Sequence, residues 1–188
     1  MSLTDGRGRS KNMIEVEAKV QVKDLEKVKS RLINLGARKV FSQTEWDTYF
    51  NHPAKDFGVS DEALRIRSSS NGERSITYKG PKISPKLKTR EELSFNIDDL
   101  KAAGDIIERL GFKKVAMVVK RREAWELSSS RVYLDEVENL GYFVEIEILV
   151  PKMVDNAEQQ AFGLLEKLCL NQEPLIRESY LELVLRRL

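Results

Sequence analysis

The sequence contains only one cysteine, Cys169, and only one histidine, His52. A single cysteine excludes an internal disulfide and a cysteine-rich zinc site, and a single histidine excludes a metal site built from several histidines. No apolar run approaches the ~20 residues that cross a bilayer, and no signal-peptide pattern opens the chain. Net charge is only +2, which gives no general attraction to nucleic acid or to an anionic membrane. We therefore expect a reduced, cytoplasmic protein that binds neither.

Charge is what the sequence has in excess. Charged residues make up 33% of the 188 residues, against the usual ~25%. Hydrophobic residues make up 41%, which is enough for a folded core and excludes extensive disorder. Residues 1–12 show no periodicity, and we expect a disordered N-terminal arm or an expression remnant there. Residues 13–188 are expected to form a single domain, because no linker divides them.

Alternating and helical patterns of apolar residues predict a mixed α+β chain. Helices are expected from Asp24 to Gly36, from Asp98 to Gly111, over 155–169 and over 178–187. The pair Asn71-Gly72 predicts a tight hairpin, and the lysine-rich segment 80–88 predicts a mobile loop. The predicted strands are 14–22, 38–50, 62–68, 74–79, 89–97, 115–125, 131–137 and 142–150.

The chain also contains an internal repeat with a constant offset of 75 residues. Val22-x-Asp24-Leu25 matches 97–100, and Leu35-Gly36-x-x-Lys39-Val40 matches 110–115. Glu17 falls on Glu92 in the same alignment. Several matches in one register predict a duplicated strand–helix–strand unit.

Charged residues recur on one face of strand after strand. Arg65 and Arg67 share a face, while Leu64 and Ile66 lie on the other. For any one strand this pattern is typical of the solvent face of an antiparallel sheet. Repeated over seven strands, it favours a closed or nearly closed antiparallel β-barrel with a charged lumen and helices outside. The lumen would hold Lys19, Arg65, Arg67, Lys79, Arg90, Lys120 and Arg122 together with Glu15, Glu17, Glu92, Asp135, Glu145 and Glu147.

So many charges in a confined space are energetically costly unless a bound ligand or ions compensate them. Arginine side chains match phosphate oxygens with two parallel hydrogen bonds. Carboxylate clusters suit hard divalent cations such as Mg²⁺ or Mn²⁺. The pattern therefore predicts a lumen that binds a polyphosphate together with metal ions.

The motif Glu15-Val-Glu17-Ala-Lys19 resembles the ExExK signature of the CYTH superfamily, which includes class IV adenylate cyclases, thiamine triphosphatases and inorganic triphosphatases. The resemblance extends from Met13 to the C-terminus. The residues of the matching segments are most similar to those of the cyclase-like branch. The family's fold is an antiparallel barrel called the triphosphate tunnel. Further segments occur in the family's order: 47–53 (DTYFNHP), 63–67 (ALRIR), 78–81 (YKGP), 89–92 (TREE), 120–122 (KRR), 134–137 (LDEV) and 140–147 (LGYFVEIE).

The resemblance implies an enzyme with roles divided within the tunnel. The implied phosphate ligands are Lys19, Arg65, Arg67, Lys79, Arg90 and Arg122. The implied ligands of Mg²⁺ or Mn²⁺ are Glu15, Glu17, Glu92, Glu145 and Glu147, and the candidate catalytic residues are Tyr49, Lys120 and Asp135. Tyr49 and Lys120 match positions near the attacking water in some hydrolases, but Lys120 is equally expected in a cyclase.

Three functions remain open at this point. Cyclisation of ATP to cyclic AMP and pyrophosphate is the leading hypothesis, and hydrolysis of thiamine triphosphate, a nucleotide or an inorganic triphosphate is the alternative. A module that binds polyphosphate without turnover is less favoured, because its glutamates would repel the phosphates unless a metal intervened. Aromatic residues on the late strands, namely Trp125, Tyr133, Tyr142 and Phe143, predict an exposed apolar face and a homodimer. Cys169 is expected to be buried.

Overall fold

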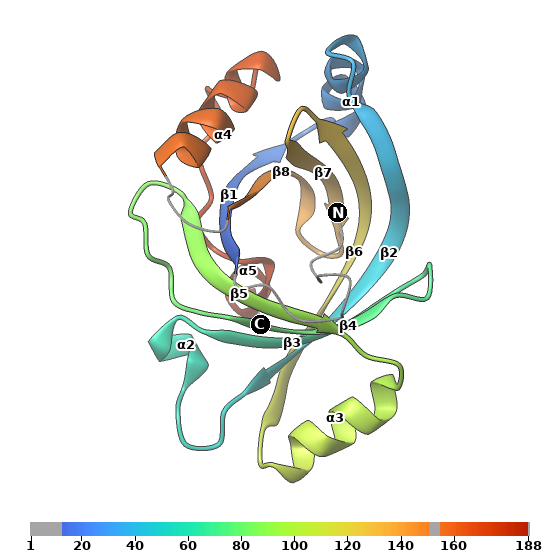
Figure 1. Cartoon of the computed structure of the whole chain (residues 1–188), viewed down its shortest axis with the longest axis vertical. Helices are drawn as coiled ribbons and strands as arrows, with labels where there is room; N and C mark the ends of the chain where they lie inside the picture. Colours follow the sequence, from blue (N-terminus) through green and yellow to red (C-terminus); the bar gives the residue numbers. More distant parts are fainter. Residues whose placement is uncertain (1–12, 151–154, 188) are drawn as a thin grey trace.

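A computed structural model describes residues 13–150 and 155–187. Each predicted strand and each predicted long helix is present (Figure 1). The helices are α1 (Leu25–Asn34), α2 (Phe57–Ser60), α3 (Leu100–Arg109), α4 (Asp155–Lys167) and α5 (Tyr180–Leu185). The strands are β1 (Met13–Val22), β2 (Arg38–Asn51), β3 (Ala63–Ser69), β4 (Arg74–Lys79), β5 (Lys88–Asn96), β6 (Lys113–Leu127), β7 (Ser130–Val137) and β8 (Gly141–Val150).

The eight strands form a closed barrel in the order β1-β5-β4-β3-β2-β6-β7-β8, and β8 pairs with β1 to complete it. All neighbouring strands are antiparallel. Figure 1 shows the ring of strands, with α1 and α4 near one end and α3 near the other. Closure leaves no sheet edge unpaired and places one face of each strand inside the barrel. The predicted fold class is therefore confirmed.

The internal repeat is visible in the local structure of the two halves. Asp24 caps the N-terminus of α1, and Asp99, 75 residues later, caps α3. Each helix ends before a glycine in the left-handed region, Gly36 with φ of 76° and Gly111 with φ of 92°. The sequence had placed the start of this helix, with Asp98 as its capping residue, one residue too early. Asp99 accepts the Ala102 amide hydrogen bond instead, as its repeat equivalent Asp24 does for α1.

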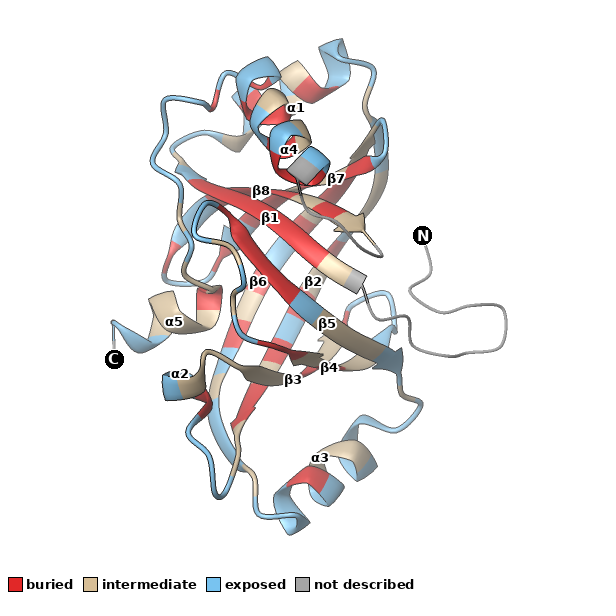
Figure 2. Cartoon of the chain, turned by 60° about the vertical axis from the view of Figure 1, so that its left-hand side comes forward, coloured by how far each residue is buried: buried red, intermediate tan, exposed pale blue. Residues whose placement is uncertain are grey.

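The apolar faces of the strands pack against helices outside the barrel. Val16, Ala18 and Val20 of β1 lie in the main core together with residues of α1 and α4, such as Leu32 and Leu164. Figure 2 shows buried residues along β1 beneath these helices. On another side, Ile107 of α3 belongs to a cluster with Ile66 of β3 and Phe50 of β2. The opposite, charged faces of the strands are consequently turned inward.

Several finer expectations are corrected by the structure. Cys169 is exposed rather than buried, because it lies in the turn after α4 with φ of 52°. Trp125 and Phe143 are buried, so the predicted aromatic outer face is reduced to Tyr142, and the argument for a homodimer loses its basis. The short helix α2 was not predicted. None of the helices within 13–150 and 155–187 is long and apolar enough to cross a membrane.

Candidate active site

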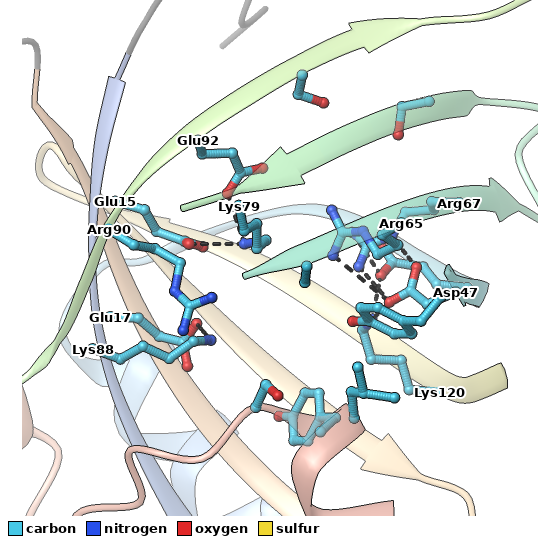
Figure 3. Close-up of a pocket in the computed structure, with 18 of the residues that line it drawn as sticks. Glu15, Glu17, Asp47, Arg65, Arg67, Lys79, Lys88, Arg90, Glu92 and Lys120 are labelled. Atoms are coloured by element: carbon cyan, nitrogen blue, oxygen red, sulfur yellow. Dashed lines mark hydrogen bonds and ion pairs between the residues drawn. The ribbon is translucent and has the colours of Figure 1, made fainter. Parts of the chain in front are cut away.

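The barrel encloses a cavity of about 490 Å³ lined by charged side chains (Figure 3). This volume is typical of a site for a small molecule. The basic lining residues are Lys19, Arg65, Arg67, Lys79, Lys88, Arg90, Lys120 and Arg122, and the acidic ones inside the barrel are Glu15, Glu17, Glu45, Asp47, Glu92, Glu145 and Glu147. All the predicted phosphate and metal ligands therefore line one cavity.

One group of ion pairs joins β1 to β4 and β5. Lys79 Nζ bridges two carboxylates, at 2.8 Å from Glu15 and 2.7 Å from Glu92. Lys88 Nζ lies 2.6 Å from Glu17 on the paired strand. These contacts fix the acidic side chains of β1 on the inner face, as the alternation in its sequence predicted.

Lys19 connects this group to the C-terminal segment. Its Nζ lies 3.1 Å from Glu17 and 3.2 Å from Glu145, and it donates a hydrogen bond of 2.9 Å to the backbone oxygen of Glu178. The same nitrogen is 4.3 Å from the centre of the Tyr180 ring, which is a cation–π distance. The start of α5 thereby covers the inner end of Lys19.

A second group of ion pairs joins β2, β3 and β6. Asp47 accepts hydrogen bonds from Arg67 Nε at 2.5 Å and from Lys120 Nζ at 2.8 Å. Glu45 lies 3.0 Å from Arg67 and 2.9 Å from Lys120. Burial raises the pKa of Asp47, but the charges of Arg67 and Lys120 outweigh it and hold that pKa well below its ordinary value. The two carboxylates therefore stay ionised and orient the two cations.

Asp135 differs from the predicted catalytic role in its position. It is fully buried and does not line the cavity. It accepts two hydrogen bonds from Arg122, at 2.7 and 2.5 Å, and one from the Tyr180 hydroxyl at 2.8 Å. Asp135 thus lies behind Arg122 and is hydrogen-bonded to that guanidinium, so a direct catalytic role for it stays a prediction.

The other two candidate catalytic residues do line the cavity. Tyr49 and Arg65 are directly opposite each other on β2 and β3. Lys120 is 2% exposed and lies on the inner face of β6. Arg121, between Lys120 and Arg122, points outward and reaches only Glu136, at 3.6 Å. The facing predicted for this strand is confirmed.

Two arginines keep hydrogen-bond donors that other side chains have not taken up. Among the described residues, no partner accepts from the buried Nε atoms of Arg65 and Arg90. Arg65 approaches Asp47 only at 3.8 Å, and Arg90 approaches Asp61 only at 3.4 Å. Buried donors without acceptors are costly. These two guanidinium groups are the ones best prepared to receive an anion.

Acidic charge accumulates where β1, β5 and β8 meet. Glu17 and Glu147 are directly opposite each other across β1 and β8. Burial, and then the negative charges of Glu15 and Glu92, raise the pKa of Glu147 to about 8. The raised pKa shows that a second negative charge is unfavourable at this corner, so the corner would gain from a bound cation.

The carboxylates at this corner fit the divalent metal that the family implies. Within 13–150 and 155–187, no three acidic, His or Cys side chains converge in a ready-made metal site. The buried Oε1 of Glu17 nevertheless has only the ion pair with Lys19 Nζ at 3.1 Å and accepts no well-aligned hydrogen bond from the described residues. Carboxylate oxygens of this kind are the ligands that Mg²⁺ and Mn²⁺ prefer. Glu15, Glu17 and Glu147 would hold such an ion, with Glu92 and Glu145 nearby in the lining.

The structure adds residues that the sequence did not single out. Lys88 was assigned to the lysine-rich loop, but it is the first residue of β5 and faces inward. Glu45 and Asp47 were missed because the outer face of β2 carries polar residues as well, so its alternation is weak. Tyr180 comes from the C-terminal segment and no local pattern could have placed it in the barrel.

Comparison with known proteins agrees with this geometry. The CYTH domain model matches residues 13–180. A Methanocaldococcus jannaschii protein named as a putative adenylate cyclase is 39% identical over 173 residues, covering 91% of this chain and 98% of that protein. Adenylate cyclase CyaB of Aeromonas hydrophila is 27% identical, covering 88% and 86%. The solved structure of the PH1819 protein from Pyrococcus horikoshii has a TM-score of 0.82 at 37% identity, covering 93% and 99%.

Proposed function

This chain belongs to the CYTH family, and from that premise we propose that it is a metal-dependent adenylate cyclase that binds ATP in the barrel. In this reaction the ribose 3′-oxygen attacks the α-phosphorus. The bond to the β-phosphate oxygen breaks, and cyclic AMP, pyrophosphate and a proton are released. The names of the two curated relatives support the cyclase assignment.

The observation that carries the proposal is the pair of arginines with free donors in a closed, charged cavity. Arg65 and Arg90 would bind phosphate oxygens through their unpaired Nε–H groups. Lys120, held by Glu45 and Asp47, would place positive charge beside the phosphate that is attacked. Asp135 would keep Arg122 oriented toward the substrate.

A divalent ion held by Glu15, Glu17 and Glu147 would stabilise negative charge on the phosphates and on the departing pyrophosphate. The chain's own contribution is to present these carboxylates from adjacent strands and to keep bulk water out of a narrow lumen. A binding module without turnover would gain nothing from acidic groups in contact with its anion.

Hydrolysis of a triphosphate is the second candidate. It is favoured by the position of Tyr49, whose side chain lines the cavity directly opposite Arg65 and could orient a water toward a bound phosphate. A plant protein of the same fold, from Hippeastrum, is described as a putative adenylyl cyclase with a dominant triphosphatase activity, at a TM-score of 0.64 and 16% identity.

The test is incubation with ATP, thiamine triphosphate and tripolyphosphate in turn, with Mg²⁺ or Mn²⁺, followed by identification of the products. A cyclase gives cyclic AMP and pyrophosphate from ATP. Orthophosphate without cyclic AMP would reject the cyclase assignment and support hydrolysis. Binding of all three ligands without any product would reject both enzymes.

A further inference from the structure

The lining of the cavity changes character along the barrel axis. On β2 the charged residues Asp47 and Glu45 are followed by Gln43, and on β3 Arg67 is followed by Ser69. Ser75 on β4 likewise lies nearer that end than Lys79. The strand register pairs Ser75 with Asn96 and Ser94 with Thr77, and it places Ser69 and Ser75 directly beside the charged section, opposite Glu45 and Arg67.

We call this region the neutral end, and it consists of Phe41, Gln43, Ser69, Ser75, Ser94, Asn96 and Tyr133. These seven residues offer hydroxyl, amide and aromatic groups, and the charged residue that lies beside them in the lining is Glu73 of the β3–β4 hairpin. Its Tyr133 ring already stacks against the guanidinium of Arg122, whose Cζ is 4.0 Å from the ring centre. Such a lining suits an uncharged, planar, polar group rather than further phosphates.

Gln43 has an unpaired acceptor in this region. It is only 8% exposed, and its Oε1 accepts no hydrogen bond from any residue that the structure describes. Its Nε2 donates to Glu45 at 2.9 Å and lies 3.3 Å from the Ser69 hydroxyl. A buried carbonyl oxygen of this kind calls for a donor from outside the barrel.

The orientation of the Gln43 amide is fixed by chemistry. Burial raises the pKa of Glu45, but the positive charges of Lys120 and Arg67 outweigh burial and hold that pKa below its ordinary value. This carboxylate is therefore ionised and can only accept hydrogen bonds. The Gln43 nitrogen must therefore face Glu45, and a flipped amide would set two acceptors against each other. The oxygen is consequently the free end of the side chain.

Building on the proposed function, we infer that the neutral end holds the organic half of the triphosphate substrate and that Gln43 Oε1 accepts a hydrogen bond from its exocyclic amino group. Gln43 is directly opposite Arg122 on β6, so it adjoins the charged section where the phosphates would lie. Adenine has such an amino group, and so does the aminopyrimidine ring of thiamine triphosphate. Gln43 is then a specificity-determining residue.

The experiment measures metal-free equilibrium binding of ATP, inosine triphosphate, thiamine triphosphate and tripolyphosphate. Inosine triphosphate carries a carbonyl where ATP carries the amino group. We expect the parent protein to prefer ATP over inosine triphosphate by roughly 5- to 150-fold, the usual cost of an unpaired buried acceptor. Gln43→Met, which keeps the volume and removes the acceptor, should abolish that preference and change tripolyphosphate affinity less than about twofold.

The matched control is Ser42→Met, which introduces the same side chain at an exposed neighbouring position on the outer face and should leave all four affinities unchanged. If Gln43→Met weakens the binding of thiamine triphosphate alone, the amino group that Gln43 recognises is that of thiamine rather than that of adenine. If Gln43→Met does not fold, Gln43→Asn, whose side chain is one methylene shorter, moves the acceptor away from the ligand and should also abolish the preference.

Equal weakening of the binding of all four ligands, or no change in the binding of any, overturns the inference. Failure of the parent to bind tripolyphosphate would instead overturn the proposed function, and this inference with it.

Discussion

Glu45 and Lys120 form an ion pair of 2.9 Å across β2 and β6, and they occupy equivalent positions of the internal repeat, 75 residues apart. The same is true of Glu15 and Arg90, which are directly opposite each other on β1 and β5. At these two positions an acid in the first half therefore faces a base in the second, whereas across β1 and β8 Glu17 faces Glu147. A duplicated unit with identical residues would have set like charges against each other there. The divergence of the repeats thus places opposite charges side by side inside the barrel at these two positions.

The proposed metal-binding glutamates Glu15, Glu17 and Glu147 should be required for turnover and not for anion binding. Glu17→Gln removes a carboxylate that lies opposite Glu147 and is paired with Lys88. We expect Mg²⁺- or Mn²⁺-dependent turnover to fall at least 100-fold, because the metal would lose a ligand. Tripolyphosphate binding without metal should persist, since Lys19 and Lys88 lose only a neutralising partner. Parent-like turnover in this variant would show that Glu17 holds no metal.

The barrel and its charged lumen could be predicted because most strands alternate sharply. In β1 each charged residue lies between aliphatic ones, as Arg65 of β3 lies between Leu64 and Ile66, and the strand period then decides the facing. Gly36 and Gly111 ended their helices where expected, since a left-handed residue is needed there. These are local signals, and local patterns are what a sequence displays most clearly.

What could not be predicted depends on contacts between distant segments. The pairing of Asp135 with Arg122 and Tyr180 joins β7, β6 and α5, and nothing near Asp135 in the sequence indicates these two partners. Cys169 was misplaced because its burial depends on whether α4 ends before or after it. A one-residue difference in the end of a helix turns a side chain by about 100°.

Acid should destabilise the fold through Asp47. Its pKa is held well below the ordinary value, so its contribution is complete above about pH 4 and is lost as the pH falls toward the folded-state pKa. Asp47→Asn leaves Arg67 and Lys120 short of a partner and should reduce the free energy of unfolding at pH 7 by roughly 3 kcal/mol. The difference from the parent should shrink below pH 4.

Urea unfolding at pH 7, 4, 3 and 2 measures this effect. The control is Glu136→Gln, which removes an exposed partner 3.6 Å from Arg121 and should cost less than about 1 kcal/mol at pH 7. A constant difference between Asp47→Asn and the parent at all four pH values would contradict the assignment.

Tyr180 should stabilise the barrel through two separable contacts. Tyr180→Phe removes the hydrogen bond to Asp135 and keeps the ring over Lys19, and should reduce the free energy of unfolding by about 1.5–3 kcal/mol. Tyr180→Leu also removes the ring, which packs against Phe143 at 5.2 Å, and should cost more. Chemical denaturation gives the order of the three proteins. Equal stability of the parent and Tyr180→Phe would show that the hydroxyl is dispensable.

Affinity for phosphate should depend on which way a side chain faces in the barrel. Arg65 lines the cavity with an unpaired Nε–H, whereas the Arg121 side chain is 78% exposed on the outer face. Arg65→Ala should weaken tripolyphosphate binding by about 10- to 150-fold, the equivalent of roughly 1.5–3 kcal/mol for a hydrogen bond to a charged group. Arg121→Ala should change it by less than about 0.5 kcal/mol. Isothermal titration with tripolyphosphate makes the comparison independent of the organic half of the substrate. If Arg121→Ala weakened binding as much as Arg65→Ala, the phosphates would have to bind outside the barrel, and the tunnel would not be the active site.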